Sequence, residues 1–523
     1  MYATTQEQDL SETSTQPAIT GSKVRVFCLV FFFVALACTY LQWFVHGYRG
    51  FKLEDSGIFL HVAQRLMHGD VLYRDIADNK PPLIYWINAL GLLLGRGSPG
   101  GVLFLSLVSG MLTFAVFYFG LKHYIGWQLF IVTACLSQLA FLACALHPNY
   151  TESFALPLAA LAGVLFVRDF LNGGEVRWYA PAQGAIAALL FCLRANNIGI
   201  CIIYFLYLLL QLRTGTRFRQ LCSFVLAAAV VYGLVLVPLV VQGTVPDYVT
   251  NVFRLAAPYT FGTTVAARLR AFWHGLILLD QSPLLYFTLA CVATVILSQR
   301  RNRRTRLVIW LAAWLVLEVI LSSTSGYHWE HYYLLWIPPL ALMMMLAGSL
   351  LFASGVNPIL PVAVALSLML VLFHESVIGA HRVGTTARTD DSVVALARTY
   401  ATSSDRVTTW GYFYHDLWFD LDHRPGTRWF HEGAFTNRKI YQALMPSFLS
   451  DLEKNRPRIV IERRCVLPLF APPDPTEPLN YAFPAAYFQG WDDAAIAQRK
   501  AALARFYQPV AEKSGIVVYV RHD

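Results

Sequence analysis

Long apolar runs recur along the first 375 residues of this chain, and they constrain its fold more than any other feature. A helix needs roughly 20 predominantly apolar residues to cross a bilayer. Runs of about that length lie near 24–45, 102–121, 127–146, 153–171, 179–193, 198–212, 221–242, 283–298, 307–323, 332–351 and 357–375. The sequence therefore predicts a polytopic α-helical membrane protein with about eleven transmembrane helices.

The composition excludes several other classes of protein. Charged residues make up only 14% of the 523 residues and hydrophobic residues 56%, whereas soluble domains carry about 25% charged residues. A soluble enzyme, a disordered chain and a collagen-like chain are therefore excluded. The formal charge of +9 arises from 41 Lys and Arg against 32 Asp and Glu. Because the basic residues cluster in short loops between apolar runs, they indicate topology and no nucleic-acid partner.

The charges of the short loops predict which loops face the cytoplasm. The most basic loops, 213–219 and 300–306, fall on the same side if the spans alternate, and the positive-inside rule makes that side cytoplasmic. The N-terminus is then inside. The outer loops are 46–101, 147–152, 194–197, 243–282 and 324–331, and everything after His374 is also outside. The short apolar segment Pro81–Gly95 is expected on the outer surface as an interfacial helix.

Three regions follow from this pattern. Residues 1–22 are polar and predict a disordered cytoplasmic tail, and residues 23–376 form the transmembrane domain. Residues 377–523 are charged and rich in proline, with short β-like runs at 407–410, 458–461 and 516–520. They predict a small extracytoplasmic α/β domain.

Ionisable residues are concentrated in the first outer loop, 46–101. Glu54 and Asp55 directly follow the first span, Arg74 lies in the middle of the loop, and Asp78 and Lys80 precede the interfacial helix. Ionisable groups at a membrane edge are costly unless they are hydrated or used. One interpretation is a solvated loop whose charges pair with one another; the other is a functional site.

The order of these residues resembles the GT-C membrane glycosyltransferases. More narrowly, it resembles the bacterial branch of the protein O-mannosyltransferase and aminoarabinose-transferase superfamily (glycosyltransferase families 39 and 83). The shared pattern is an acidic pair after the first span, an Ala-x-x-Leu-x-x-Gly helix, a Tyr-x-Asp and an acid-x-Lys-Pro. The resemblance covers residues 24–375 in hydropathy and order and is most specific over 53–90; Asn149–Glu152, Arg194 and His331–Tyr333 also fit.

The resemblance implies the GT-C fold and an inverting hexosyl or pentosyl transfer from a polyprenyl-phosphate sugar donor. The reaction would take place on the outer face of the cytoplasmic (inner) membrane, with an unidentified envelope glycan, lipid or protein as acceptor. Asp55 matches the family's catalytic Asp, which acts as a base and takes the proton of the acceptor hydroxyl. Lys80 matches the lysine that contacts the donor phosphate. Arg74 is either a second phosphate contact or a headgroup anchor.

Five further residues are expected around the same cavity: Glu54, Asp78, Glu152, Arg194 and His331. Glu54 and Asp78 are interpreted as supporting or pairing residues and not as bases. Glu152 either orients the acceptor or pairs with Arg194. His331 either donates to the phosphate or lines the cavity.

Three features stay open at this level. Ile58-Phe59 stands where many relatives have Arg-Tyr, so one phosphate contact is missing; Arg65 and Arg74 are the nearest replacements. His328 and His331 are spaced as two metal ligands could be, without an identifiable third; a divalent metal is therefore an open alternative, and no other cofactor is indicated. The segment Asp247–Trp273 suits either a lid over a lipid-phosphate entrance or headgroup anchoring.

The competing functional class is a polytopic transporter or flippase of a lipid-linked saccharide. It predicts charges within the spans and internal repeats. The predicted spans contain few charges, with Glu318 the main exception, and no repeat is evident. A non-catalytic scaffold, or a ligase on another fold, is a third alternative. The acids in the first outer loop favour the glycosyltransferase.

Overall fold

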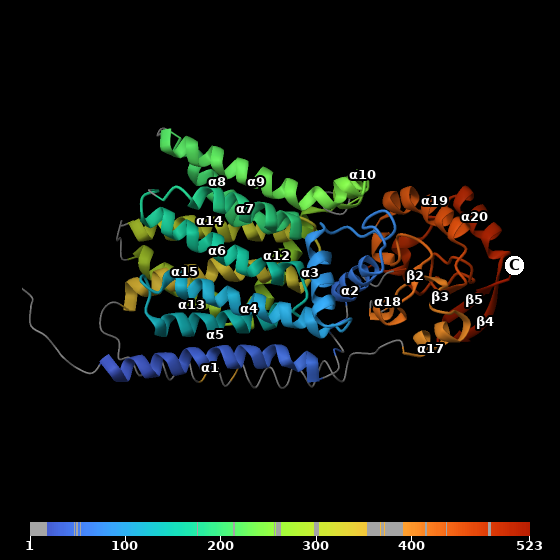
Figure 1. Cartoon of the computed structure of the whole chain (residues 1–523), viewed down its shortest axis with the longest axis horizontal. Coiled ribbons are helices and arrows are strands. Elements are labelled where there is room, and N and C mark those ends of the chain that lie inside the picture. The colour runs from blue at the N-terminus through green and yellow to red at the C-terminus, as the bar shows by residue number, and fades with distance from the viewer. Residues whose placement is uncertain are drawn as a thin grey trace, which may run out of the picture.

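The structure is a computed structural model. It describes residues 18–45, 48, 51–52, 54–174, 176–212, 215–255, 257, 263–297, 303–352, 367, 371, 391–413, 416–435, 437–479 and 483–522. A helical bundle lies at one end of the molecule, and residues 391–522, which we call the C-terminal domain, lie at the other (Figure 1).

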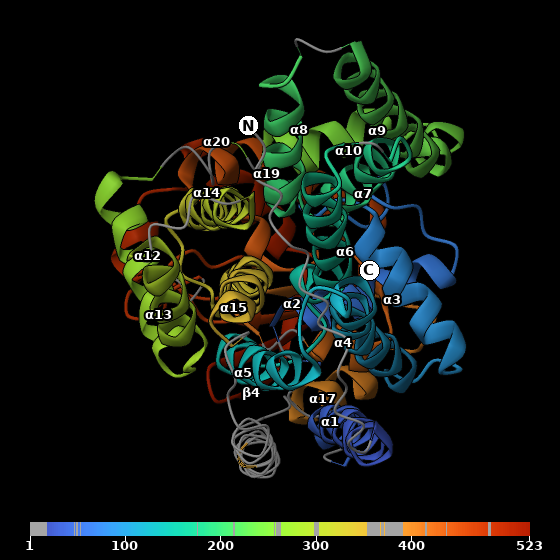
Figure 2. The ribbon, with the colours of Figure 1, turned by 90° about the vertical axis from the view of Figure 1, so that its left-hand side faces the viewer.

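Most helices of the bundle run side by side along the long axis of the molecule (Figure 1). They are α1 (Ala18–Val45), α4 (Gly100–Leu121), α5 (Trp127–Cys144), α6 (Thr151–Leu171), α7 (Tyr179–Leu193), α8 (Gly199–Leu209), α9 (Gly215–Val241), α13 (Leu284–Leu297), α14 (Arg303–Ser323) and α15 (Ile337–Phe352). Viewed along the bundle, α6 and α15 lie inside, α7 to α9 lie on one side and α12 (Val265–Asp280) and α13 on another (Figure 2).

Seven helices of the described chain are long and apolar enough to cross a membrane, or eight if the bent pair α12–α13 forms one span. These seven correspond to seven of the eleven expected spans. The expected spans 179–193 and 198–212 appear as the shorter helices α7 and α8, because the polar segment Arg194–Asn197 interrupts the apolar pattern. The expected span 283–298 is α13, which Pro283 separates from α12 at an angle of 95°. The expected span 357–375 lies almost wholly outside the described residues.

Two region boundaries were predicted, after residue 22 and near residue 376. Helix α1 begins at Ala18, so the last residues of the predicted 1–22 tail are helical. Residues 1–17 of that tail lie outside the described residues. The predicted boundary near residue 376 also lies outside them.

Basic side chains gather at one end of the bundle. Nε of Arg168 donates to the Gly120 carbonyl at 2.9 Å, and Nη1 of Arg217 lies 3.1 Å from the Asp169 carboxylate. The guanidinium of Arg303 lies over an aromatic ring at the end of α6. These contacts bring the end of α4, the end of α6 and the beginnings of α9 and α14 to the same end of the bundle. The described ends of the two most basic loops are therefore on one side, as the charge pattern predicts.

The opposite end carries α2 (Glu54–Met67), α3 (Leu83–Leu94) and the C-terminal domain. Helix α3 runs across the ends of the bundle helices and not alongside them (Figure 1), which is the orientation expected of an interfacial helix. Close packing against α4 fixes its position: a Cβ atom on Gly101 would lie 1.9 Å from the Gly91 carbonyl oxygen. Only glycine allows the two backbones to approach so closely.

The C-terminal domain is built on a five-stranded sheet with the strand order β2-β1-β3-β5-β4. Strand β1 (Arg406–Trp410) is parallel to β2 (Arg424–Pro425) and β3 (Ile459–Arg463), with Val407 opposite Ile459. Strand β5 (Ile516–Arg521) is antiparallel to β3 and to β4 (Tyr507–Lys513). The three strands expected from the sequence are therefore present.

Alternating side chains of the sheet build two cores. Val407, Ile461 and Val518 pack with α17 (Asp391–Tyr400) and α18 (Asp416–Leu421) on one face. Val460 and Tyr519 pack with α19 (Arg438–Asn455) and α20 (Ala494–Ala504) on the other. Helices therefore cover both faces, as buried parallel strands require.

The C-terminal domain is docked on the bundle through α18 and the segment after it. Trp418, Phe419 and Phe430 are part of the hydrophobic core of the bundle. Nζ of Lys52 lies 2.6 Å from the Asp420 carboxylate. The apolar contacts and this ion pair join the domain to the end of the bundle that carries α2 and α3.

Candidate functional site

Asp55 lies in the first turn of α2, directly after Glu54. Acidic residues at this position are favoured because the N-terminus of a helix carries partial positive charge. The apolar face of α2 is buried against the bundle and the C-terminal domain, which fixes the direction of the helix. The side chain of Asp55 stays 27% exposed. A carboxylate is thus held rigidly at the end of the bundle that carries α2 and α3 and is still accessible.

Lys80 approaches Asp55 from the other end of the loop. Its Nζ lies 3.6 Å from Oδ2 of Asp55, and its side chain is 16% exposed. Its carbonyl oxygen accepts a hydrogen bond of 2.7 Å from the Tyr73 hydroxyl, which holds the backbone. Burial opposes the charge on Lys80, but the carboxylates of Asp55 and Asp78 outweigh it and raise the pKa of this lysine above its usual 10.5. Lys80 is a fixed cation beside an accessible carboxylate.

A stack of three rings forms the wall behind Asp55. The rings of His147 and Tyr150 are stacked with centroids 3.9 Å apart, and Tyr150 and His331 are stacked at 4.1 Å. His331 comes from a 3₁₀ turn, Glu330–Trp336, that leads into α15, and its Nε2 lies 3.9 Å from Oδ2 of Asp55. The Tyr150 hydroxyl donates to the Glu54 carboxylate at 2.9 Å. Both adjacent acids thus have a partner in this wall.

Glu152 and Arg194 form a buried ion pair next to this wall. Nη1 of Arg194 donates to Oε1 of Glu152, whose side chain is 1% exposed. The hydroxyl of Thr151 donates to the other oxygen at 2.8 Å. The guanidinium of Arg194 also lies 3.8 Å from the ring centroid of Tyr332. Of the two interpretations of Glu152, pairing with Arg194 is the one visible in the geometry.

A network of buried amide side chains holds α2, which carries Asp55, in place. This network was not identified from the sequence. Nδ2 of Asn149 donates to the Ser56 hydroxyl at 2.7 Å and to Oδ1 of Asn88 at 2.9 Å. Nδ2 of Asn88 donates back to Asn149 at 3.1 Å. These bonds tie α2 to α3 and to the start of α6. A buried Asn in the apolar run of α3 was the available signal, since buried amides require partners.

Arg74 and Asp78 are turned away from the Asp55 carboxylate. Nη2 of Arg74 lies 3.1 Å from its neighbour Asp75, and the Arg74 side chain is 52% exposed. Asp78 accepts a hydrogen bond of 2.6 Å from the Tyr85 hydroxyl and lies 3.5 Å from Nε2 of His431. The structure thus brings together Glu54, Asp55, Lys80 and His331, with the Glu152–Arg194 pair beside them. It leaves Arg74 on the surface, paired with a neighbouring acid.

The residues present do not fit the metal site that the His-x-x-His spacing suggested. The ring of His331 faces Tyr150 and Asp55, whereas the ring of His328 packs against His274 with centroids 4.9 Å apart. Among the residues that the structure describes, no three His, Cys, Asp or Glu side chains are grouped so as to hold a metal ion.

Two other features of the loops that were expected to be outside differ from the simplest expectation. Arg65, a suggested replacement for the missing phosphate contact, is engaged elsewhere, with Nε 2.7 Å from Asp70. The segment Asp247–Trp273 comprises the last part of α10 (Val245–Val249), a π-helical turn (Thr250–Arg254) and the first half of α12. Pro258 and Tyr259 of this segment lie outside the described residues, so its interpretation as a lid stays a prediction.

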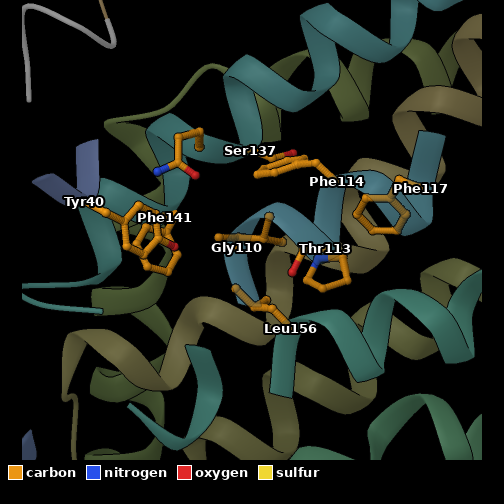
Figure 3. A pocket seen from close by; sticks show the side chains of 11 residues that line it. Tyr40, Gly110, Thr113, Phe114, Phe117, Ser137, Phe141 and Leu156 are labelled. Atoms are coloured by element: carbon orange, nitrogen blue, oxygen red, sulfur yellow. The ribbon is translucent and has the colours of Figure 1, made fainter. Parts of the chain in front are cut away.

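A small cavity lies within the bundle, between side chains of α1, α4, α5, α6 and α15 (Figure 3). Its volume is about 20 Å³, which is room for about one water molecule. It is lined by Tyr40, Gly110, Thr113, Phe114, Phe117, Ser137, Gln138, Phe141, Leu156, Ile337 and Pro338. Asp55 and Lys80 do not line it, and it is too small for a lipid or a sugar.

The bundle, the acidic segment that follows α1 and the appended α/β domain together define the GT-C fold, the fold of a class of membrane glycosyltransferases. Comparisons with solved structures agree. ArnT from Cupriavidus metallidurans in the apo state matches with a TM-score of 0.56 and 15% identity, over 96% of this chain and 98% of that chain. The same protein bound to undecaprenyl phosphate matches with a TM-score of 0.57, the same identity and the same coverage.

Two further comparisons concern the sequence and a more distant structure. Residues 79–242 match the family model described as dolichyl-phosphate-mannose-protein mannosyltransferase. The oligosaccharyltransferase AglB from Archaeoglobus fulgidus, in complex with an inhibitory peptide and a dolichol-phosphate, matches with a TM-score of 0.46 and 12% identity over 84% of this chain and 69% of that chain. No curated protein sequence matched this chain. The resemblance to the GT-C mannosyltransferase and ArnT group is therefore confirmed, and the protein is a multi-pass membrane protein of this fold.

Proposed function

We propose that this protein is an inverting glycosyltransferase that moves a hexosyl or pentosyl group from a polyprenyl-phosphate donor to a hydroxyl group of an envelope glycan, lipid or protein. The observation that carries the proposal is the accessible Asp55 carboxylate, whose Oδ2 lies 3.6 Å from the Lys80 ammonium. One group suits a base and the other suits an anionic leaving group. The match of residues 79–242 to a mannosyltransferase model and the ArnT-like fold support the same chemistry.

In this reaction the acceptor oxygen attacks the anomeric carbon of the donor. The new carbon–oxygen bond forms as the bond between that carbon and the phosphate oxygen breaks, and the electron pair leaves with the phosphate. Asp55 takes the proton of the acceptor hydroxyl, because a neutral hydroxyl is a poor nucleophile. Lys80 stabilises the negative charge that grows on the departing phosphate. Inversion follows when acceptor and phosphate lie on opposite faces of the sugar.

The surroundings of Asp55 suit this division of roles. His331, at 3.9 Å from Asp55, is near enough to hold the carboxylate or to donate to a bound phosphate. Glu54 accepts a hydrogen bond from the Tyr150 hydroxyl, and Asp55, which lies beside Lys80, is interpreted as the base of the acidic pair. Asp78, Glu152 and Arg194 are interpreted as residues that position these groups. Arg74 is interpreted as a headgroup anchor, since its side chain is half exposed.

We also propose the orientation of the protein in the inner membrane. The basic loops at one end of the bundle indicate the cytoplasmic side, which puts the N-terminus inside and the site and the C-terminal domain outside. The donor lipid then reaches the site from the outer leaflet. Labelling of single cysteines introduced at Arg168 and at the exposed Arg74 tests this: a membrane-impermeant reagent should reach only the latter in intact cells.

The function is tested with purified protein in detergent and a panel of radiolabelled polyprenyl-phosphate sugars. Transfer to an envelope extract is expected for wild type and should fall by at least about 10²-fold in Asp55→Asn, the lower range for loss of a general base. Asp422→Asn is the matched control, because Asp422 is a loop acid of the C-terminal domain that is 51% exposed and lies 3.8 Å from the ring of His68. Equal rates for wild type and Asp55→Asn would remove Asp55 as the base. Movement of labelled lipid across proteoliposomes without covalent transfer would favour a flippase.

A further inference from the structure

The C-terminal domain contacts the loop that carries Lys80. Between α2 and α3 the described chain has neither helix nor strand, only a bridge between Leu72 and Ile76. The backbone N–H of Ala77 donates to the Arg428 carbonyl of the C-terminal domain at 2.8 Å. Ala77 is fully buried and belongs to the hydrophobic core of that domain. The shape of this loop is therefore set partly from outside the transmembrane bundle.

The C-terminal domain also contacts Asp78, two residues before Lys80. Nε2 of His431 lies 3.5 Å from Oδ1 of Asp78, and the two side chains are only 4% and 6% exposed. The other oxygen of Asp78 accepts from the Tyr85 hydroxyl of α3 at 2.6 Å. Asp78 is thus held between the C-terminal domain and the interfacial helix. Burial would raise the pKa of Asp78, but His431, Lys80 and Tyr85 together bring it below its usual value.

One hydrogen bond of His431 defines which of its ring nitrogens carries the proton. Nδ1 of His431 accepts from the backbone N–H of Gly433 at 3.2 Å. A neutral imidazole that accepts at Nδ1 carries its proton on Nε2, and Nε2 is the atom directed at the Asp78 carboxylate. The turn Glu432–Ala434, which contains Gly433, therefore selects the tautomer that can donate to Asp78.

A second, independent contact anchors the beginning of the same loop. Asp70 binds Arg424 of strand β2 with Nη2 at 2.7 Å from Oδ1, while its Oδ2 lies 2.7 Å from Arg65 of α2. The side chain of Asp70 is 5% exposed. The loop is thus fixed by the C-terminal domain at its beginning through Asp70 and near its end through Ala77 and Asp78. Lys80, the lysine of the site, follows Asp78 by two positions.

We propose that His431 of the C-terminal domain is a positioning residue for the site in the bundle: by binding Asp78, it holds the loop end that places Lys80 beside Asp55. This inference rests on the proposed function, because it assigns Lys80 to the donor phosphate. It gives the C-terminal domain a defined part in donor binding in addition to covering the site. His431 does not touch the reacting atoms in this scheme.

The test measures binding of undecaprenyl phosphate, the sugar-free lipid, to the full-length protein in detergent. His431→Asn is expected to weaken binding by about tenfold, the size for loss of one close polar contact with a charged group, because the short amide does not extend to the position of Nε2. His431→Gln restores a donor near that position and should recover most of the affinity. His423→Asn is the matched control: His423 is equally buried in the same domain, with its ring against the Leu421 carbonyl.

The outcomes separate the inference from the proposed function. If His431→Asn binds as wild type does, or if His431→Gln and His423→Asn are as weak as His431→Asn, His431 is not a positioning residue. If wild type does not bind the lipid, the proposed function fails, and amide hydrogen exchange of residues 70–80 then decides the inference. Exchange of this segment should be faster in His431→Asn than in wild type; equal exchange would overturn the positioning role.

Discussion

Removal of Arg194 is the sharpest available test of what Glu152 does. The Glu152 carboxylate is 1% exposed and bonded to the Arg194 guanidinium. In Arg194→Met it would keep the Thr151 hydroxyl, at 2.8 Å, and its own backbone N–H, so a buried charge would lose its counter-ion. In Glu152→Gln the remaining cation is 14% exposed and lies 3.8 Å from the ring centroid of Tyr332. The two single substitutions should therefore lower the free energy of unfolding by unequal amounts.

The expected magnitudes follow from this asymmetry. Leaving a buried charge without its partner costs about 3–5 kcal/mol, so Arg194→Met should lower the free energy of unfolding by about that amount. Glu152→Gln keeps a hydrogen-bond acceptor beside a partly hydrated cation and should cost about 1–3 kcal/mol. In the double variant the buried charge is gone and the amide still accepts from Thr151. It should therefore be about 2 kcal/mol more stable than Arg194→Met alone.

Equilibrium unfolding in mixed detergent micelles of increasing SDS content, followed by circular dichroism, measures these differences. Transfer activity of the same four proteins separates the two interpretations of Glu152. If Glu152 only balances Arg194, the double variant recovers activity together with stability. If Glu152 contacts the acceptor, stability returns and activity does not. A double variant no more stable than Arg194→Met would refute the reasoning, because the cost would then not come from the unpaired carboxylate.

Three further predictions concern other parts of the site. Lys80→Gln should weaken undecaprenyl phosphate binding by about 1.5–3 kcal/mol, the contribution of a hydrogen bond to a charged group, with Lys80→Arg intermediate; equal affinities would exclude a phosphate contact. The pKa of Asp78 lies below its usual 3.8, so its stabilisation is complete above that value and is lost only as the pH falls through the lower, folded-state pKa. Protection of the Ala77 amide, corrected for intrinsic exchange, should therefore be the same at about pH 5 and about pH 7 in His431→Gln, whose side chain at this position has no titratable group, and a decrease at about pH 5 would contradict this. Gly101→Ala should lower the free energy of unfolding by about 1–3 kcal/mol, since its Cβ would lie 1.9 Å from the Gly91 carbonyl oxygen; Gly233→Ala, with open space around it, is the control.

Much of the architecture could be predicted because a bilayer restricts the solutions. A span must satisfy its backbone hydrogen bonds internally, so a long apolar run such as 153–171 can only be a helix, and α6 occupies Thr151–Leu171. Prediction is weaker where an apolar run is short. The runs at 179–193 and 198–212 form the short helices α7 and α8, because run length alone does not tell a full span from a shorter buried helix.

The candidate site could be predicted in part. The acidic pair and the lysine drew attention because charges at a membrane edge need a reason, and the resemblance to the GT-C glycosyltransferases assigned their roles. The separation of Arg74 from the site was not predictable: its distance from Lys80 along the chain is short, but the turn at Tyr73–Asp75 directs it to the surface, where it pairs with Asp75. The amide network of Asn88 and Asn149 escaped notice because hydrogen bonds between residues 61 positions apart leave no local pattern.

The sequence by itself determined that the chain is a multi-pass helical membrane protein with its acids at one edge, because hydrophobicity and charge act locally and show in the order of residues. Only the tertiary structure decided that Lys80 and His331 meet at Asp55 and that Glu152 pairs with Arg194. It alone also joined the C-terminal domain to Asp78 through His431, more than 350 positions along the chain. Contacts of that kind depend on how separate elements pack, and packing is a property of the folded chain as a whole.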